Sequence, residues 1–376
     1  MFNRANPCQK KHKTGAVMPQ LKKLFANNRG IALLITLSIT TILVAAALEY
    51  NRRARFEVIS TASVRDRMTL SYAASSGIHV AMALLIKDKG ESSFDSLDED
   101  WANPEKIDEI LQEIPFEKGK LAVKITDELG KVQVNALVRF PDSRQVNESQ
   151  MMLWERLLGI IGSADDLQGD SSPTAIVNSV KDWLDSGDDD ATTGLSGAES
   201  SYYEEKDPPY ASRNGPLENL NELLLIKGIT PQLFYGTKDV PGLVNYMTVH
   251  GLAVGAGTEF NWPGRININT AEVPVLAALL GTENQDLAQT LIEYRQEIAA
   301  GKDVHDFSDP KWYKNITGFG DVTLDPRMIT VTSDVFRIQS TASLDSIQTS
   351  VIAVVERVQN SQSGKWSCKI LSWETL

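Results

Sequence analysis

One uninterrupted apolar stretch constrains this chain more than any other feature. Residues 31–48, IALLITLSITTILVAAAL, contain no charged side chain, and eighteen residues are about the minimum with which an α-helix crosses a hydrocarbon core of roughly 30 Å. The thirty residues before it carry seven Lys or Arg and no Asp or Glu. Because basic flanks stay in the cytoplasm, we expect a single-pass inner-membrane protein with a cytoplasmic N-terminus and a periplasmic ectodomain.

The junction in front of the apolar stretch predicts how the chain is processed. An ordinary secretory signal is cut after its apolar segment, whereas Arg29-Gly30-Ile31 lies before it. This arrangement resembles a type IV prepilin signal, which a prepilin peptidase cuts after the glycine while the apolar helix is retained. Gly30 would be the last leader residue, and Ile31 would be the first mature residue, N-methylated after cleavage. A plain signal anchor is the alternative, and a start at Met18 would shorten the leader.

Charge and cysteine content narrow the possible functions of the ectodomain. Removing residues 1–30 takes away seven of 37 basic residues and none of 49 acidic ones, which leaves a net charge of about −19. Such an acidic chain repels phosphate backbones, so no nucleic acid is expected as a partner. Cys8 would leave with the leader and Cys368 would remain alone, so the ectodomain must be stabilised by its core rather than by an internal disulfide.

Hydrophobic periodicity predicts an α+β fold. Helical spacing continues from residue 49 to 89 without a proline, and a short helix is expected near 104–114. The run LAVKITDELGKVQVNAL predicts a β-hairpin turning at residues 127–130. Alternating runs at 328–332, 336–343 and 347–358 predict its partner strands. We therefore expect a pilin-like N-terminal spine helix packed on an antiparallel sheet, with a large helical insertion domain between strands.

These patterns also predict where the parts of the chain begin and end. The expected parts are a cleaved prepilin leader at 1–30, a transmembrane helix at 31–48, a pilin-like domain at 49–145 and 326–360, an inserted helical domain with an acidic loop at 146–325, and a C-terminal tail at 361–376.

The acidic loop of the insertion is the strongest candidate for a binding site. Residues 182–207 contain nine carboxylates and one cation, Lys206. Calcium and similar hard cations take oxygen ligands, while the absence of Cys and His from this segment argues against zinc. The EF-hand spacing is missing too. From the residues alone, a solvated acidic loop is the favoured interpretation, and a cation-binding site is the alternative.

Three motifs in this region resemble the K-type pseudopilin family of type II secretion systems. They are VKDWLDSGDDD, GAESSYYEEKDPPY and NGPLENLNELLLIKGI. Most pilins have Glu as the fifth mature residue, and Ile35 at that position fits the K type. The resemblance implies a structural calcium ion and these candidate ligands: Asp185, Asp188, Asp190 and Glu199, with Asp182 and Glu204 as secondary candidates.

The same resemblance implies a function in protein export across the outer membrane. Family members cap the tip of a periplasmic pseudopilus together with the I-type and J-type minor pseudopilins, and they prime assembly with the other pseudopilins. The glutamate missing at Ile35 has a physical rationale, because a subunit at the tip has no neighbour above whose N-terminal amine it must neutralise. An unpaired carboxylate in hydrocarbon would also be costly.

A membrane-tethered DNA-binding protein of a competence or type IV pilus system is the main alternative. The stretch RININTAEVPVLAALLGTENQDLAQTLIEYRQ is similar to helix-hairpin-helix elements of DNA-binding competence proteins. DNA-binding hairpins aim backbone N–H groups at a phosphate from a glycine-rich turn beside basic residues. Here Glu283 lies at the turn and the second glycine is absent, so a packing role is favoured. Asn267, Asn269 and Thr270 are expected to cap the helix from Ala271.

No enzyme is predicted. The four histidines lie in no metal-ligand spacing, and the chain contains no G-x-S-x-G elbow, no C-x-x-C pair and no complete dinucleotide fingerprint.

Overall fold

The computed structural model describes residues 30–113, 119–141, 143–162, 167–187, 192–255, 259–299 and 306–376. The chain forms two units, residues 1–66 and 67–376. Helix α2 (Ile31–Glu91) contributes to both.

In the first unit, α2 is a membrane-type helix. Among the residues that the structure describes, α2 is the one helix long and apolar enough to cross a membrane, and none of its apolar window is buried inside the protein. Three threonine hydroxyls in it bond to the helix's own backbone: Thr36 and Thr40 each donate to the carbonyl three residues earlier, at 2.9 Å, and Thr41 donates to the carbonyl of Leu37 at 2.7 Å. Internal hydrogen bonding of this kind suits a hydrocarbon environment, which offers polar groups no other partner.

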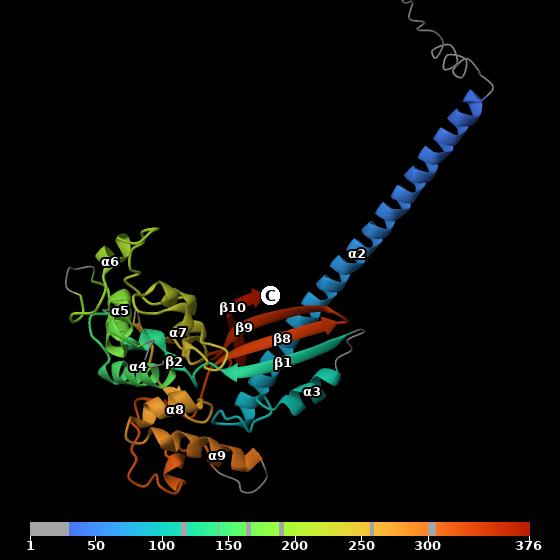
Figure 1. Cartoon of the computed structure of the whole chain (residues 1–376). Helices are drawn as coiled ribbons and strands as arrows, with labels where there is room; N and C mark the ends of the chain where they lie inside the picture. The colour runs from blue at the N-terminus through green and yellow to red at the C-terminus, as the bar shows by residue number, and fades with distance from the viewer. Residues whose placement is uncertain are drawn as a thin grey trace, which may run out of the picture. The chain divides into compact units, whose positions relative to one another are not determined.

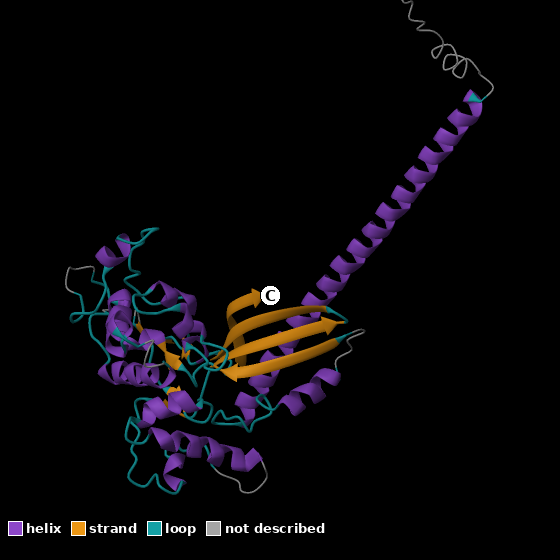
Figure 2. Cartoon of the chain, viewed as in Figure 1, coloured by secondary structure: helices purple, strands orange, loops and turns teal. Residues whose placement is uncertain are grey.

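The second unit contains a four-stranded antiparallel sheet (Figures 1 and 2). Its strand order is β1-β8-β9-β10, with β1 at Lys120–Asp127, β8 at Val335–Leu344, β9 at Ile347–Gln359 and β10 at Trp366–Thr375. β1 and β8 are neighbours although about 200 residues separate them, since Ile125 pairs with Ile338. The intervening residues form most of the helical part, which confirms the predicted α+β class with helices inserted between strands.

The last third of α2 packs on this sheet through small side chains. Its buried residues recur every three or four positions: Leu70, Ala73, Ala74, Gly77, Ile78, Ala81, Leu84, Leu85 and Asp88. At Gly77 the approach is closest, because a Cβ atom there would collide with Ser340 of β8 and Val123 of β1. The sheet residues that meet the helix include Phe336, which Trp101 contacts edge-on with ring centroids 5.0 Å apart. Helix α3 (Pro104–Gln112), predicted near 104–114, covers the same core and is capped by Asn103.

A second apolar core lies within the helical part and holds the fully buried Trp154 and Phe319. α4 packs against both α5 and α8. The α-helices of this part are α4 (Glu148–Ile161), α5 (Pro173–Leu184), α6 (Ser200–Glu204), α7 (Pro231–Tyr235), α8 (Val273–Leu280) and α9 (Ala288–Ala299). The 3-10 helices are η1 (Val134–Leu137), η2 (Gly169–Ser171), η3 (Leu220–Leu225), η4 (Leu243–Asn245), η5 (Gln285–Leu287) and η6 (Trp312–Asn315). The short strands are β2 (Val132–Gln133), β3 (Met247–Thr248), β4 (Ala253–Val254), β5 (Phe260–Asn261), β6 (Ile266–Asn267) and β7 (Ile329–Thr330).

Two strand predictions were wrong. The segment after Gly130 does not return along β1 as a hairpin: β2 pairs in parallel with β3, and η1 follows it. Residues 328–332 contribute β7, which pairs with β6 rather than with the main sheet. In both cases the alternating apolar residues are buried in the second core. Alternation predicts that one face of a segment is buried, but it does not identify the partner strand.

The predicted capping role of Asn267, Asn269 and Thr270 was also wrong. Helix α8 begins at Val273 after Glu272, which makes no side-chain cap. The Asn267 amide and the Thr270 hydroxyl instead donate to Asp127 at the end of β1, at 2.9 and 2.6 Å. These polar side chains therefore join the helical part to the sheet.

The segment expected as a C-terminal tail forms strand β10. It pairs with β9 and has an irregularity between Ile370 and Ser372. Its side chains reach α2: the Cys368 thiol lies 3.7 Å from the Met82 carbonyl oxygen, and the Trp373 ring lies 6.5 Å from that of His79. The sheet thereby gains an outer strand that also packs on the long helix.

Candidate metal centre

The candidate site lies where the end of α5 meets the start of α6. Asp182 is in the last turn of α5 and Asp185 is its C-cap residue, while Glu199 directly precedes α6. Residues i and i+3 lie on the same side of a helix, so Asp182 and Asp185 face Glu199 together. The three side chains come from segments fourteen residues apart in sequence.

Aromatic packing holds these two segments together. Trp183 of α5 contacts Tyr203 of α6 edge-on at 5.0 Å between ring centroids, and Tyr203 stacks on Tyr210 at 5.3 Å. The Tyr203 hydroxyl accepts a hydrogen bond from the backbone N–H of Lys227 at 3.3 Å. The Trp of the W-L-D motif and the second Tyr of the Y-Y motif thus act as packing residues that place the carboxylates beside them.

The carboxylate oxygens are close enough to share one cation. One oxygen from each of Asp182, Asp185 and Glu199 lies within 4.8 Å of the other two, and the three residues are 0, 8 and 3% exposed. Oxygens bound to one Ca²⁺ lie at most about 5 Å apart, twice the metal–oxygen distance of 2.3–2.6 Å. The donor set is therefore all-oxygen, buried and compatible with a hard cation.

Backbone groups orient the two aspartates. The N–H of Thr193 donates to both oxygens of Asp182, at 3.1 Å each, and the N–H of Gly187 donates to Asp185 at 3.2 Å. The loop passes so near to Asp182 that a Cβ atom at Gly197 would collide with its carboxylate. Glycine at 197 is thus required for the loop to close over the carboxylates.

The electrostatics of the site favour a positive charge. Two carboxylates at the C-terminal end of α5 face the negative end of the helix dipole and each other. Lys181 partly neutralises them: its ammonium group lies 2.9 Å from Asp185 and 3.6 Å from Asp182. Burial lowers the pKa of Lys181, but the hydrogen bond and charge of Asp185, together with Asp182, outweigh burial and raise the pKa above its ordinary value.

The structure brings together three of the six predicted ligands. Asp188 and Asp190, with Asp189 between them, lie outside the described residues. Glu204 is exposed at the end of α6 and is not part of the carboxylate cluster. At the other end of the chain, Gly30 is an exposed turn residue whose carbonyl accepts from Leu34 at 3.1 Å.

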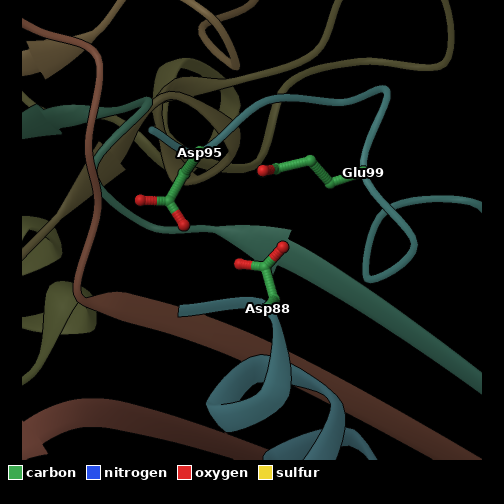
Figure 3. Close-up of side chains that lie close together, drawn as sticks. All are labelled: Asp88, Asp95 and Glu99. Atoms are coloured by element: carbon green, nitrogen blue, oxygen red, sulfur yellow. The ribbon is translucent and has the colours of Figure 1, made fainter. Parts of the chain in front are cut away.

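A second carboxylate cluster, not anticipated from the sequence, lies at the end of α2. Asp88, Asp95 and Glu99 place one oxygen each within 4.8 Å of one another, and Figure 3 shows their side chains converging from the helix and the loop that follows it. Glu99 is held by hydrogen bonds from the Ser96 N–H at 2.8 Å and the Trp101 indole at 3.0 Å.

This second cluster already contains a cation from the protein. The guanidinium of Arg357, on β9, is 0% exposed and donates to Asp88 at 3.0 Å. It also donates to Asp95 and to the Ser333 carbonyl, and it lies 4.6 Å from the centre of the Phe336 ring. The cluster is thus a buried ion-pair network that joins α2 to the sheet. In the sequence, the charged Arg357 within the apolar run of β9 was the feature that could have indicated it.

Burial in this network changes the acidity of Asp88. Burial chiefly, and the nearby charges of Glu99 and Asp95, raise the pKa of Asp88 to about 7 against the opposing effect of Arg357. Arg357, even with the Lys89 ammonium group 3.8 Å from Asp95, therefore does not fully compensate the crowded carboxylates.

The turn between α8 and α9 does not have the features of a phosphate site. Gly281 ends α8 with φ of +81°, and the next residues, Thr282 and Glu283, are exposed. An acidic side chain at the tip of the turn opposes a DNA phosphate. The two helices instead contribute apolar residues, such as Leu276 and Leu291, to the second core.

Comparisons with known proteins agree with this architecture. Two family models, both described as type II secretion system protein K, match residues 130–237 and 266–326. The type II secretion system protein K of Pseudomonas aeruginosa is 28% identical over 260 residues, covering 66% of this chain and 67% of that protein. The protein K of Klebsiella pneumoniae is 27% identical over 277 residues, covering 72% and 74%.

A solved structure shares the fold. In the GspK-GspI-GspJ complex of the enterotoxigenic Escherichia coli type 2 secretion system, one chain matches with a TM-score of 0.60 and 18% identity, over 84% of this chain and 99% of that chain. The family models, the relatives and the spine helix on its antiparallel sheet lead to one conclusion. This chain belongs to the protein K family of type II secretion systems and is a minor pseudopilin.

Proposed function

We propose that this chain forms the tip of a type II secretion pseudopilus together with the I-type and J-type minor pseudopilins. The observation that supports this most is the fold match to a chain solved as part of a GspK-GspI-GspJ complex, because the match spans nearly all of that chain. Ile35 adds a second argument, since a subunit without a neighbour above it needs no carboxylate at the fifth mature position.

The membrane part of the proposal rests on α2. Its apolar window has the length and composition of a membrane span, and the basic residues precede it, so the ectodomain lies in the periplasm. A prepilin peptidase cuts between Gly30 and Ile31, and the new N-terminus is methylated. The chain then leaves the inner membrane by assembling with the other pseudopilins and acts as a structural component rather than as a catalyst.

A calcium ion at the carboxylate cluster completes the proposal. Asp182, Asp185 and Glu199 would hold it, with Asp188 and Asp190 as further candidates in the loop between them. The ion would supply positive charge to buried carboxylates. These residues would thereby fix the loop after α5 onto α6.

Co-purification tests the assembly. The full-length chain is co-expressed with the I-type and J-type pseudopilins of the same organism and extracted in detergent, and the molar mass of the complex is measured by light scattering. A parallel sample with labelled duplex DNA is tested for a mobility shift. A stable three-protein complex without a DNA shift is the expected result. Failure to associate, together with salt-sensitive DNA binding, would reject the proposal in favour of a DNA receptor.

Thermal unfolding in calcium or in chelator tests the ion. Calcium should raise the melting temperature of the full-length chain, and Glu199→Gln should remove that effect. Glu204→Gln is the matched control, because Glu204 is an acidic residue of the same helix region that lies outside the cluster. Equal melting temperatures of the unaltered protein in calcium and in chelator would refute the calcium site.

A further inference from the structure

Lys181 occupies an unusual position for a residue beside a calcium site. Its ammonium group lies 2.9 Å from Asp185, 3.6 Å from Asp182, and within hydrogen-bond distance of the Thr193 hydroxyl. The side chain is 17% exposed. Within the described part of the chain, the ion pairs of Asp182 and Asp185 are both with this one lysine.

A calcium ion and this ammonium group compete for the same oxygens. An ion about 2.3–2.6 Å from the Asp185 carboxylate would lie only a few ångströms from an ammonium group bonded to that carboxylate. Like charges at such a distance repel strongly in a buried, low-dielectric site. The two cations therefore exclude one another, and the lysine must move before the ion binds.

The structure gives Lys181 a way to move. Its four-carbon stem is flexible, and the partial exposure of the side chain leaves a path to solvent. The Thr193 N–H remains bonded to Asp182, so this contact can hold the loop in place while the ammonium group leaves.

We propose that Lys181 is a built-in counter-ion that neutralises Asp182 and Asp185 without calcium and that calcium must displace. This inference rests on the proposed calcium site and adds the residue that sets its affinity. Because displacement of the lysine opposes binding, the protein responds to calcium over a higher concentration range than the carboxylates alone would give.

Calcium titration of the full-length chain in detergent, by calorimetry and by thermal unfolding, tests the inference. Lys181→Met removes the charge and keeps the length, so it should tighten calcium binding by about twofold to fivefold, the range of a partly exposed ion pair. It should also lower the melting temperature in chelator. Lys181→Gln should act in the same way if the methionine variant folds poorly, whereas Lys181→Arg should keep the original affinity.

Lys131→Met is the matched control. Lys131 is 18% exposed and pairs with the buried Glu128 at 2.7 Å, so it resembles Lys181 in burial and pairing but is not part of the carboxylate cluster. Its loss should leave calcium affinity unchanged. If Lys181→Met and Lys181→Gln both bind calcium no more tightly than the unaltered protein, the role of Lys181 is refuted while the calcium site stands. Absence of calcium binding by the unaltered protein and every variant would overturn the calcium site as well.

Discussion

Replacing Arg357 by methionine should destabilise the protein more than almost any other single change. The guanidinium is fully buried and bonded to two carboxylates and two carbonyl groups. Hydrogen bonds to charged groups contribute about 1.5–3 kcal/mol each, but the desolvation of the ions offsets much of this. Removing one partner of a buried ion pair leaves an uncompensated charge, and the net loss is typically about 3–5 kcal/mol. Such a loss is a large fraction of a normal folding free energy.

The pH dependence of this loss makes the prediction specific. A carboxyl group whose pKa is raised on folding stabilises the protein fully below its unfolded pKa, and that contribution is lost as the pH rises through the folded pKa. For Asp88 this range extends from about 4 to about 7. Without Arg357 the pKa of Asp88 should rise further, because the guanidinium is the group that lowers it. The variant should therefore lose least stability in acid and most above neutral pH.

Thermal unfolding of the full-length chain in detergent, followed by tryptophan emission at about pH 5 and about pH 8, measures this. Trp101 donates to Glu99 and reports on the network directly. Adding Asp95→Asn to Arg357→Met should restore part of the lost stability. Arg327→Met, which removes an exposed pair with Asp325, should have no measurable effect. A loss that is the same at both pH values would refute the reasoning.

Three further changes have defined outcomes. Gly77→Ala should cost about 1–3 kcal/mol through overpacking, seen as a lower melting temperature, and Ser340→Ala in the same chain should recover part of it because Ser340 is the nearest side chain. Burial raises the pKa of Asp127 to about 6 against its hydrogen bonds, so the protein loses stability as the pH rises from about 4 to about 6. The melting temperature of Asp127→Asn, measured relative to that of the unaltered protein, should therefore rise over that pH range, and a fall would contradict this. Gly30→Val should block removal of the leader, which electrophoresis would show as a larger membrane-bound product; normal processing would contradict the cleavage site.

Periodicity predicted the elements whose apolar face is long. Helix α2 and strands β8 and β9 were all expected from spacing, because a face buried over several turns or over eight or more strand residues leaves a clear pattern. The partner of β1 could not be predicted, since it lies about 200 residues away and alternation carries no information on pairing. β10 was missed because none of its side chains is fully buried, so its pairing rests mainly on backbone hydrogen bonds to β9.

The candidate site was predictable only in part. Charge density pointed to the acidic loop, but the choice of Asp185 and Glu199 came from family motifs, since nothing in the spacing says that α6 folds back onto α5. Packing of Trp183 on Tyr203 produces that approach. The network around Arg357 was missed for a related reason: its acidic members lie about 260 residues from the arginine, and isolated acids near residue 100 look like an ordinary polar loop.

The two carboxylate clusters differ in the cation that the protein supplies, and this difference assigns them different roles. Arg357 is completely buried, and its planar guanidinium is hydrogen-bonded in several directions. It therefore cannot leave without unfolding the junction between α2 and the sheet. Lys181 is partly exposed on a flexible stem. A fixed cation suits the junction that links the long helix to the sheet, because that helix also carries the membrane span. An exchangeable cation suits a loop whose order depends on a free ion. Substituting arginine at 181 and lysine at 357 separates these roles: Lys181→Arg should leave calcium binding nearly as it is, whereas Arg357→Lys should still destabilise the protein, since an ammonium group cannot replace the planar fork.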